Sequence, residues 1–206
     1  MLVKEAKQIV VSLSKPSKMP CKGYGLPALE SCPVGSKLAK LENSTCGDCY
    51  ACKGQYQFSN VKNAQRARME SINNPLWVDA MVKLIGNDKY FRFHDSGDIF
   101  SLDYFKKIIA VAAKLPNCQF WLPTREKGLV KRYMSAGGYV PSNLTIRLSA
   151  AMIDSAAPDI GLPTSTVHDS KAPIGHACIA PKQNGECGDC RACWDPAIEN
   201  VSYAKH

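Results

Sequence analysis

The sequence has no long apolar run. Its first apolar stretch, IVVSL at 9–13, is shorter than the hydrophobic region of a signal peptide. No other stretch approaches the roughly 20 apolar residues that a membrane-spanning helix requires. A glycine-rich phosphate loop, a Ser-His-Asp order and a zinc-protease helix are also missing. We therefore expect a cytoplasmic protein with no membrane partner and with none of these three kinds of active site.

The composition does not have the low hydrophobicity of a disordered chain. Hydrophobic residues make up 45% of the sequence and charged residues 21%, as in ordinary globular proteins. A chain of 206 residues can bury one substantial core, so we expect a single domain over 1–206. The ten cysteines are unusual. Because disulfides need an oxidising compartment, clustered cysteines in a cytoplasmic chain favour metal binding or redox chemistry.

The formal net charge of +8 raises the question of a nucleic-acid partner. Eight thiolates around two cubane clusters would cancel about half of this charge, because each site would carry about −2. The basic residues are also scattered, and their densest group, Lys62, Arg66 and Arg68, is typical of a solvated face. A nucleic-acid partner is therefore the alternative and not the first interpretation.

Strand-like and helical patterns alternate through the middle of the chain. The strand-like segments are 90–94, 119–123, 144–148 and 164–168, with a further short one at 8–13. The helical segments are 60–74, 75–86, 102–115 and 127–136. This order predicts an α/β core of parallel strands at 60–170, either a partial (β/α) barrel or an open sheet. Cys-rich loop segments at 15–54 and 171–206 are expected to flank it.

Polar residues follow the predicted strands at their carboxyl ends, where parallel sheets bind ligands. This position predicts one shared pocket, although helix capping is an alternative role for such residues. The candidate catalytic residues are His94, Asp95, Ser96, Asp98, Arg125 and Arg147. The candidate cofactor-binding residues are Gly97, His168 and His176.

Each candidate has a chemical reason. His94 can exchange a proton near neutral pH, and the polar turn that follows it can hold a substrate or a cofactor amine. Arg125 and Arg147 suit a carboxylate or phosphate, or else they pair with an aspartate such as Asp98 or Asp154. His176 can donate a hydrogen bond to a cluster sulfur or replace a ligand.

The phrase CGDCYAC at 46–52 returns as CGDCRAC at 187–193. Each copy has cysteines at i, i+3 and i+6, with another cysteine upstream. The two sets are Cys32, Cys46, Cys49 and Cys52, and Cys178, Cys187, Cys190 and Cys193. Such a run is an iron–sulfur pattern, whereas zinc sites usually take cysteines in pairs. We therefore expect one or two [4Fe–4S] clusters, with zinc as the alternative metal.

The assignment of the remaining cysteines stays open. The upstream Cys32 and Cys178 can each serve the other site, as the fourth cysteine does in two-cluster ferredoxins. Cys118 begins an apolar strand, so we expect it to be a buried hydrophobic residue. Cys21 is a spare candidate ligand.

Several motifs in register resemble the bacteriophage "gene product 88" family. They are GSKLAK with CGDCYACKG, FRFHDSGDIFS, FWLPTRE, LTIRLSAAM, PTSTVHD and CIAPKQNGECGDCRACWD. The resemblance implies a phage gene expressed in the cytoplasm of an infected bacterium, and it implies no particular reaction. The family pattern does not require a cysteine at Cys52. This implies that Cys32, Cys46 and Cys49 hold a cluster with an open iron.

The presence or absence of an iron without a fourth cysteine ligand distinguishes an enzyme from a simple electron carrier. Radical S-adenosylmethionine enzymes have one on a full or partial parallel barrel, but their usual Cys-x3-Cys-x2-Cys spacing does not occur here. Our first hypothesis is a redox or radical-type enzyme with a small-molecule substrate or redox partner, and with S-adenosylmethionine as a candidate cofactor. The alternatives are a simple electron carrier and a cluster- or zinc-stabilised protein that binds nucleic acid or a host protein.

Overall fold

The computed structural model describes residues 1–205, which form a seven-stranded, all-parallel sheet in the order β1-β2-β3-β4-β5-β7-β6. The strands are β1 (Lys22–Tyr24), β2 (Tyr90–Phe93), β3 (Gln119–Thr124), β4 (Leu144–Ser149), β5 (Thr164–His168), β6 (His176–Ala177) and β7 (Asn200–Ala204). Within the described residues β1 and β6 are separate edges, so the sheet does not close. The predicted α/β class with parallel strands is confirmed, in a form compatible with a partial barrel or an open sheet.

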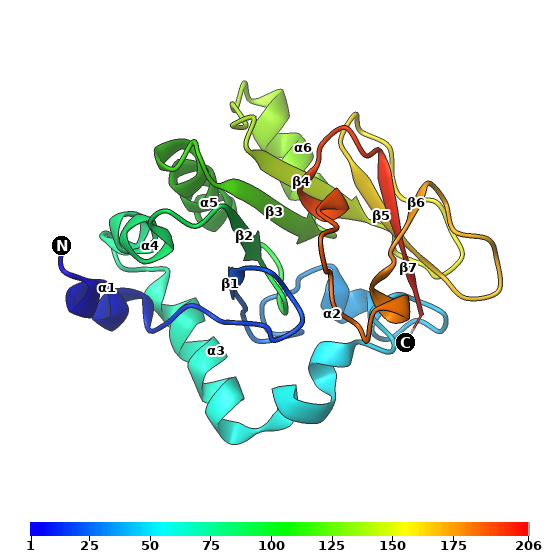
Figure 1. Cartoon of the computed structure of the whole chain (residues 1–206), viewed down its shortest axis with the longest axis horizontal. Helices are drawn as coiled ribbons and strands as arrows, with labels where there is room; N and C mark the ends of the chain where they lie inside the picture. The colour runs from blue at the N-terminus through cyan, green and yellow to red at the C-terminus, as the bar shows by residue number, and fades with distance from the viewer. Residues whose placement is uncertain (206) are drawn as a thin grey trace.

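Six α-helices accompany the sheet in the described chain. They are α1 (Val3–Val10), α2 (Gly35–Leu38), α3 (Ser59–Ser71), α4 (Trp77–Ile85), α5 (Leu102–Lys114) and α6 (Lys127–Ser135). Helix α5 connects β2 to β3 and α6 connects β3 to β4, as the alternating pattern predicts. In Figure 1, α1, α4, α5 and α6 lie on one side of the sheet, which we call the outer face. None of the helices in residues 1–205 has the length and apolar character needed to cross a membrane.

Alternation along β2 explains how the two faces of the sheet differ. Phe91 and Phe93 are fully buried in the hydrophobic core that the helices share. Arg92 points the opposite way, since successive side chains of a strand alternate. Register pairs Arg92 with Trp121 of β3, and Trp121 with Thr145 of β4. The face opposite the helices, here called the inner face, therefore carries a row of polar and aromatic side chains.

The two Cys-rich segments cover the inner face. Figure 1 shows the light-blue segment around α2 near the ends of the strand arrows, and the orange segment after β6 on the side away from the helices. Trp194 fastens the C-terminal segment, because its Nε1 donates to the carbonyl of Phe91 (3.0 Å) and its carbonyl accepts from Thr145 Oγ1 (2.7 Å). Segments from both ends of the chain thus meet over the middle of the sheet.

Two expectations about local structure are wrong. Residues 8–13 are not a strand, since α1 ends at Val10 and buries Ala6 and Val10, which are one helical turn apart, against α4. The segments 15–54 and 171–206 are not loops throughout, because they supply β1 and α2, and β6 and β7. Three of these four elements have two to four residues, too few for a periodic pattern.

Candidate functional site

The loop that carries the N-terminal cysteines is fastened to the carboxyl ends of β3 and β4. The amide of Thr45 donates to the carbonyl of Ala151 and its hydroxyl to the carbonyl of Ala150, both at 2.9 Å. The amide of Val34 donates to the Glu126 carboxylate at 2.7 Å. These bonds hold the loop at the edge where parallel α/β folds bind their ligands.

Cys32, Cys46, Cys49 and Cys52 gather in this loop. A Cβ atom added to Gly35 would lie 3.0 Å from the Cβ of Cys32 and 3.5 Å from the Sγ of Cys46, so a glycine lets the backbone pass close to both cysteines. Burial raises the pKa of the Cys32 thiol to about 12, and negative charge on Cys46 and Cys49 raises it as well. Cys32 therefore lies near Cys46 and Cys49, and negative charge on the same two cysteines raises the pKa of the Cys52 thiol.

Asp98 is buried between the ends of β2 and β3. Its carboxylate accepts hydrogen bonds from Thr124 Oγ1 (2.5 Å), the Ile99 amide (2.7 Å) and the Arg125 amide (2.9 Å). Burial raises the pKa of this carboxyl group, while these hydrogen bonds act in the opposite direction. Asp98 thus closes the turn at the base of the N-terminal cysteine loop.

His94 faces the core and not the cysteines. Its Nε2 lies 3.0 Å from the Tyr104 hydroxyl, and its Nδ1 has no hydrogen-bond partner within residues 1–205. The side chain is 2% exposed, and burial, followed by the charge of Arg92, lowers its pKa to about 3. A histidine in this state stays neutral, so its position supports packing more than proton exchange near neutral pH.

The residues after His94 are tied to other segments. Asp95 accepts hydrogen bonds from Tyr56 (3.2 Å) and Ser14 (3.4 Å) through its carboxylate. Ser96 donates to the carbonyl of Leu26 at 2.8 Å and accepts from Gln65 at 2.7 Å.

Gly97 has a φ of +81°, and a Cβ atom there would lie 2.6 Å from the Cβ of Leu26. The polar turn therefore packs tightly, and Asp95 has the most ligand-accessible side chain in it.

Arg125 and Arg147 have different surroundings. The guanidinium of Arg125 donates to Thr45 Oγ1 from Nη2 (2.8 Å) and Nε (3.0 Å), and its charge lies near Cys46. Arg147 is 0% exposed, and its four strongest hydrogen bonds, each 2.9 Å, go to main-chain carbonyls. Neither arginine pairs with Asp98 or Asp154 through its side chain among the described contacts. Arg147 therefore holds the C-terminal segment, whereas Arg125 remains available to a ligand.

The C-terminal cysteines lie over β7 and the inner face. The amide of Cys178 donates to the carbonyl of Ser202 at 2.8 Å, which extends the pairing of β6 with β7. Burial raises the pKa of the Cys187 thiol, and negative charge on Cys178 and Cys190 adds to this effect. Cys193 differs from the other three, because its Sγ lies 3.1 Å from the Tyr203 hydroxyl. Cys178 thus lies near Cys187, the first cysteine of the C-terminal run.

The two remaining histidines have separate places. His176 Nε2 lies 3.8 Å from Cys190 Sγ, so it is next to the C-terminal cysteines. His168 Nδ1 lies 2.8 Å from the Ser202 hydroxyl, which bridges β5 to β7. The carboxylate of Asp154 accepts from the amides of Asp169 (2.8 Å) and Ser170 (3.0 Å), which fixes the turn after His168.

Arg92 is the main site residue that the sequence did not indicate. Its guanidinium donates to the carbonyl of His94 (3.2 Å) and reaches the Tyr50 hydroxyl (3.5 Å), next to Cys49. Burial lowers its pKa, but negative charge on Tyr50, Asp95, Tyr203 and Cys193 raises it more, so that the net shift is upward. The one sequence signal was a charged residue between two phenylalanines on a strand.

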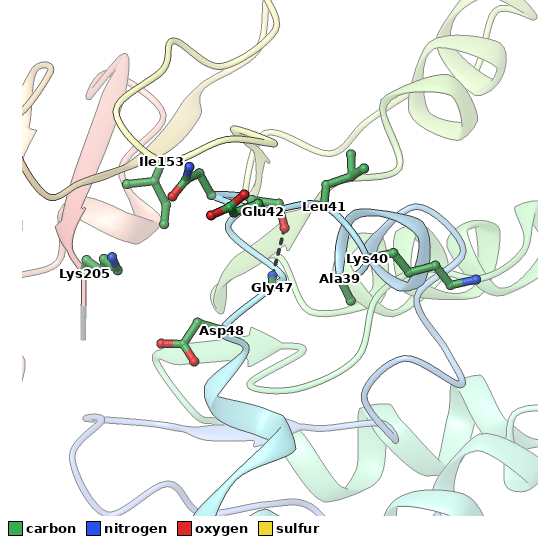
Figure 2. Close-up of a pocket in the computed structure, with 10 residues that line it drawn as sticks. Ala39, Lys40, Leu41, Glu42, Gly47, Asp48, Ile153 and Lys205 are labelled. Atoms are coloured by element: carbon green, nitrogen blue, oxygen red, sulfur yellow. Dashed lines mark hydrogen bonds between the residues drawn. The ribbon is translucent and has the colours of Figure 1, made fainter.

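A shallow hollow of about 380 Å³ lies beside the N-terminal cysteine loop, lined by 39–44, Gly47, Asp48, Ile153 and Lys205. One hydrogen bond within its lining is dashed in Figure 2 at Gly47, whose amide donates to Ser44 Oγ of the same loop at 2.8 Å. Lys205 pairs with Asp169 at 2.8 Å. The hollow thus connects the turn after Cys46 with the end of β7.

The side chains as placed do not form a site for a single metal ion. Within residues 1–205, no three His, Cys, Asp or Glu side chains come together in a group that could hold one.

The inner face also has a buried donor, Trp121 Nε1, for which the described chain supplies no acceptor. The donor chemistry of the two cysteine sets is sulfur, with one histidine beside the second set.

Comparison with known proteins places the chain in a family. Neither the curated proteins nor the solved structures include a match to it. The family model described as gene product 88 matches residues 2–196, which is nearly the whole chain. The match includes both cysteine runs and all the strands except β7, which begins four residues after the match ends. The chain therefore belongs to the phage gene product 88 family.

Proposed function

We propose that this protein is an iron–sulfur enzyme of the redox or radical type. The N-terminal set (Cys32, Cys46, Cys49 and Cys52) is the working site, and the C-terminal cysteines hold a second [4Fe–4S] cluster. When bound, such a cluster supplies one-electron chemistry, and an iron without a fourth cysteine can take S-adenosylmethionine or a substrate. The substrate is a small molecule that binds at the carboxyl ends of β2–β4.

The observation that carries the proposal is the position of the N-terminal cysteines. Thr45 and Val34 fasten their loop to the carboxyl ends of β3 and β4, and Asp98 at the end of β2 lies near Cys32 and Cys46. Catalytic groups of parallel α/β proteins gather at this edge because the loops converge there. A cluster that only transfers electrons would not need to lie at the carboxyl ends of the strands.

The residues present fit a cluster better than a single ion. Zinc bonds to sulfur are about 2.3 Å long, so a zinc site brings its thiolates nearly into contact, and no such group occurs in residues 1–205. A cubane takes one thiolate per iron and needs more room. The sulfurs of Cys32 and Cys46 both lie beside Gly35, at 3.9 Å and 3.5 Å from a Cβ atom built there, and two thiols near one another support a shared ligand.

The chain's own side chains then have defined tasks. Arg125, held by Thr45 beside Cys46, can bind an anionic group of the ligand. Asp95 is partly exposed and shares a hydrogen bond with Tyr56, so it can accept an amine or hydroxyl proton donor. Asp98 keeps the turn in place and needs no contact with substrate.

The test is spectroscopic. Protein purified without oxygen should be brown and contain iron and acid-labile sulfide, and its reduced electron paramagnetic resonance spectrum should change when S-adenosylmethionine is added. Cys46→Ala should lose the part of the signal that responds, whereas Cys118→Ala, which removes a thiol from the hydrophobic core, should retain it. Colourless protein with stoichiometric zinc would refute the proposal. Two clusters with no response to any small molecule would identify an electron carrier instead.

A further inference from the structure

Trp121 in β3 has a buried donor without an acceptor. Its side chain is 5% exposed, and its Nε1 has no hydrogen-bond partner within residues 1–205. The other two tryptophans are paired, since Trp77 Nε1 donates to the Tyr24 hydroxyl (3.2 Å) and Trp194 Nε1 to the carbonyl of Phe91 (3.0 Å). Because a buried donor without an acceptor costs free energy, proteins rarely leave one unpaired. An acceptor from outside the chain therefore belongs beside Trp121.

Arg92 in β2 also has donors without strong acceptors, and it lies against the same ring. Its guanidinium carbon is 4.3 Å from the centre of the Trp121 ring. Nε donates to the carbonyl of His94 at 3.2 Å, but Nη2 reaches only the Tyr50 hydroxyl, at 3.5 Å. Nη1 has only the thioether of Met19 at 3.2 Å, and a thioether is a weak acceptor. The outer end of the guanidinium therefore lacks the acceptor that a charged donor needs.

These donors meet between the two Cys-rich segments. Arg92 is partly exposed, so solvent reaches the guanidinium, whereas Trp121 lies deeper. Tyr50 of the N-terminal segment lies next to the guanidinium. Trp194 of the C-terminal segment packs against the Trp121 ring, with 5.2 Å between the ring centres. A small ligand that reaches this place is thus bounded by both segments, with β2 and β3 beneath it.

The missing acceptor is best supplied by an oxyanion. Asp95 does not supply it, because its carboxylate accepts from Tyr56 (3.2 Å) and Ser14 (3.4 Å) and forms no ion pair with Arg92 among the described contacts. A guanidinium presents a planar fork of N–H groups that matches two oxygens of a carboxylate or phosphate. The indole Nε1 is a donor only, so it can bond to a further lone pair of the same group. A water molecule can pair with Trp121, but it leaves the charge of Arg92 uncompensated.

We propose that Arg92 and Trp121 Nε1 bind the carboxylate or phosphate group of a small molecule on the inner face, between the two Cys-rich segments. This inference goes beyond the proposed iron–sulfur function and does not rest on it, because neither residue belongs to a cysteine set. The bound group spans β2 and β3, and it ties the ligand to the middle of the sheet.

Anion binding to the full chain tests the proposal. Equilibrium dialysis at constant ionic strength, with radiolabelled phosphate in one arm and radiolabelled acetate in the other, should show saturable binding to wild-type protein. Arg92→Met should bind neither anion. Trp121→Phe, which keeps an aromatic ring but removes the N–H group, should bind on the order of tenfold more weakly. Arg132→Met on the exposed surface of α6 removes an equal charge and should bind as wild type does.

The two arms also identify the kind of ligand. Saturable binding of phosphate alone supports a phosphorylated ligand, and saturable binding of acetate supports a carboxylate. Equal binding by Trp121→Phe and wild type would overturn the proposal. Absence of saturable binding in both arms would also overturn it, and would assign an ordered water to Trp121. Iron analysis of the same samples separates the two proposals, because anion binding by protein without iron supports this site and refutes the cluster.

A second measurement shows whether Trp121 Nε1 has a partner within the chain. In buffer without phosphate or carboxylates, Trp121→Phe should unfold at a urea concentration close to that of wild type, because the lost N–H group was unpaired. Trp77→Phe is the matched control and should unfold at a clearly lower concentration, because it also breaks the hydrogen bond to Tyr24. An equal loss in both variants would show that Trp121 already has an acceptor and would contradict the site.

Discussion

The guanidinium carbon of Arg92 lies 4.3 Å from the centre of the Trp121 ring, on the inner face of the sheet. Stacking of this kind is favourable for a cation, and here it holds the charge between the two cysteine sets. Arg92 reaches Tyr50 beside Cys49, and it lies near Cys193 and Tyr203 of the C-terminal segment. Among the described residues it forms no ion pair with a carboxylate. Tyr50, Asp95, Tyr203 and Cys193 are the groups whose negative charge acts on this arginine.

If the C-terminal cysteines hold the proposed cluster, replacing Arg92 should change its reduction potential. In Arg92→Met the potential should fall by some tens of millivolts, because the loss of a nearby unit charge removes on the order of 1 kcal/mol of stabilisation from the reduced state. Reduction adds negative charge, which the arginine stabilises. A redox titration followed by electron paramagnetic resonance measures the shift.

The control for this charge effect is Arg92→Lys, which keeps the positive charge and should stay near the wild-type potential. An equal shift in both variants would indicate that packing on Trp121 matters and the charge does not.

Arg147 should be a stability residue. Its replacement by Met leaves the carbonyls of Thr164, Ile198, Ala192 and Asp195 without their donor. Each buried unpaired acceptor costs about 1–3 kcal/mol, so we expect a loss of at least 3 kcal/mol in the free energy of unfolding. Urea denaturation monitored by Trp fluorescence measures it. The exposed Arg132→Met on α6 should change stability by less than about 0.5 kcal/mol, and an equally small loss in Arg147→Met would contradict the assigned role.

His94 should make stability depend on pH. Its pKa is about 3 in the folded protein and 6.5 in its ordinary state, so the unfolded chain binds a proton that the folded chain excludes. This stabilisation is present above pH 6.5 and is lost as the pH falls towards 3. Between pH 7 and pH 5 it amounts to about 2 kcal/mol.

His94→Asn should lose this part of the pH dependence, because it removes the titrating group and because Asn tolerates the φ of +59° at this position. Unfolding free energies at pH 7 and pH 5 test the expectation, and His168→Asn, at the partly exposed end of β5, is the matched control. The same pH slope in His94→Asn and wild type would show that His94 does not stay neutral.

Cys52 decides whether the N-terminal site has an open iron. If Cys32, Cys46 and Cys49 suffice, Cys52→Ala should keep about eight irons per chain, while Cys46→Ala should fall to about four. Iron and sulfide analysis measures this difference. Loss of half the iron in Cys52→Ala would indicate a closed four-cysteine site instead.

Local sequence patterns predicted the centre of the chain well. Strands β2–β5 and helices α3–α6 all lie where periodicity placed them, and Ser101 caps α5 by accepting a hydrogen bond from the Tyr104 amide at 3.1 Å. Each of these elements has an alternating or helical pattern of apolar residues. β1 and β6 have two or three residues and are held by distant partners, so no local pattern indicated them.

The candidate polar residues show that a position near the end of a strand does not by itself predict a role in ligand binding. His94 and Asp98 follow a strand and Arg147 lies within one, but their hydrogen bonds assign them to the core, to a turn and to the C-terminal segment. Arg125 alone of the two arginines remains beside the N-terminal cysteines.

The sequence by itself determined that two cysteine runs bracket a parallel α/β core, because ligand spacing and hydrophobic period are local properties of a chain. Only the tertiary structure brought Cys187 to Lys18, whose carbonyl accepts from the Cys187 amide at 3.2 Å, and Cys193 to the Tyr203 hydroxyl. It also placed Arg92 between the two cysteine sets. These relationships depend on hydrogen bonds and packing between residues far apart in sequence, or on which side of a strand a residue faces, and spacing along the chain does not encode them.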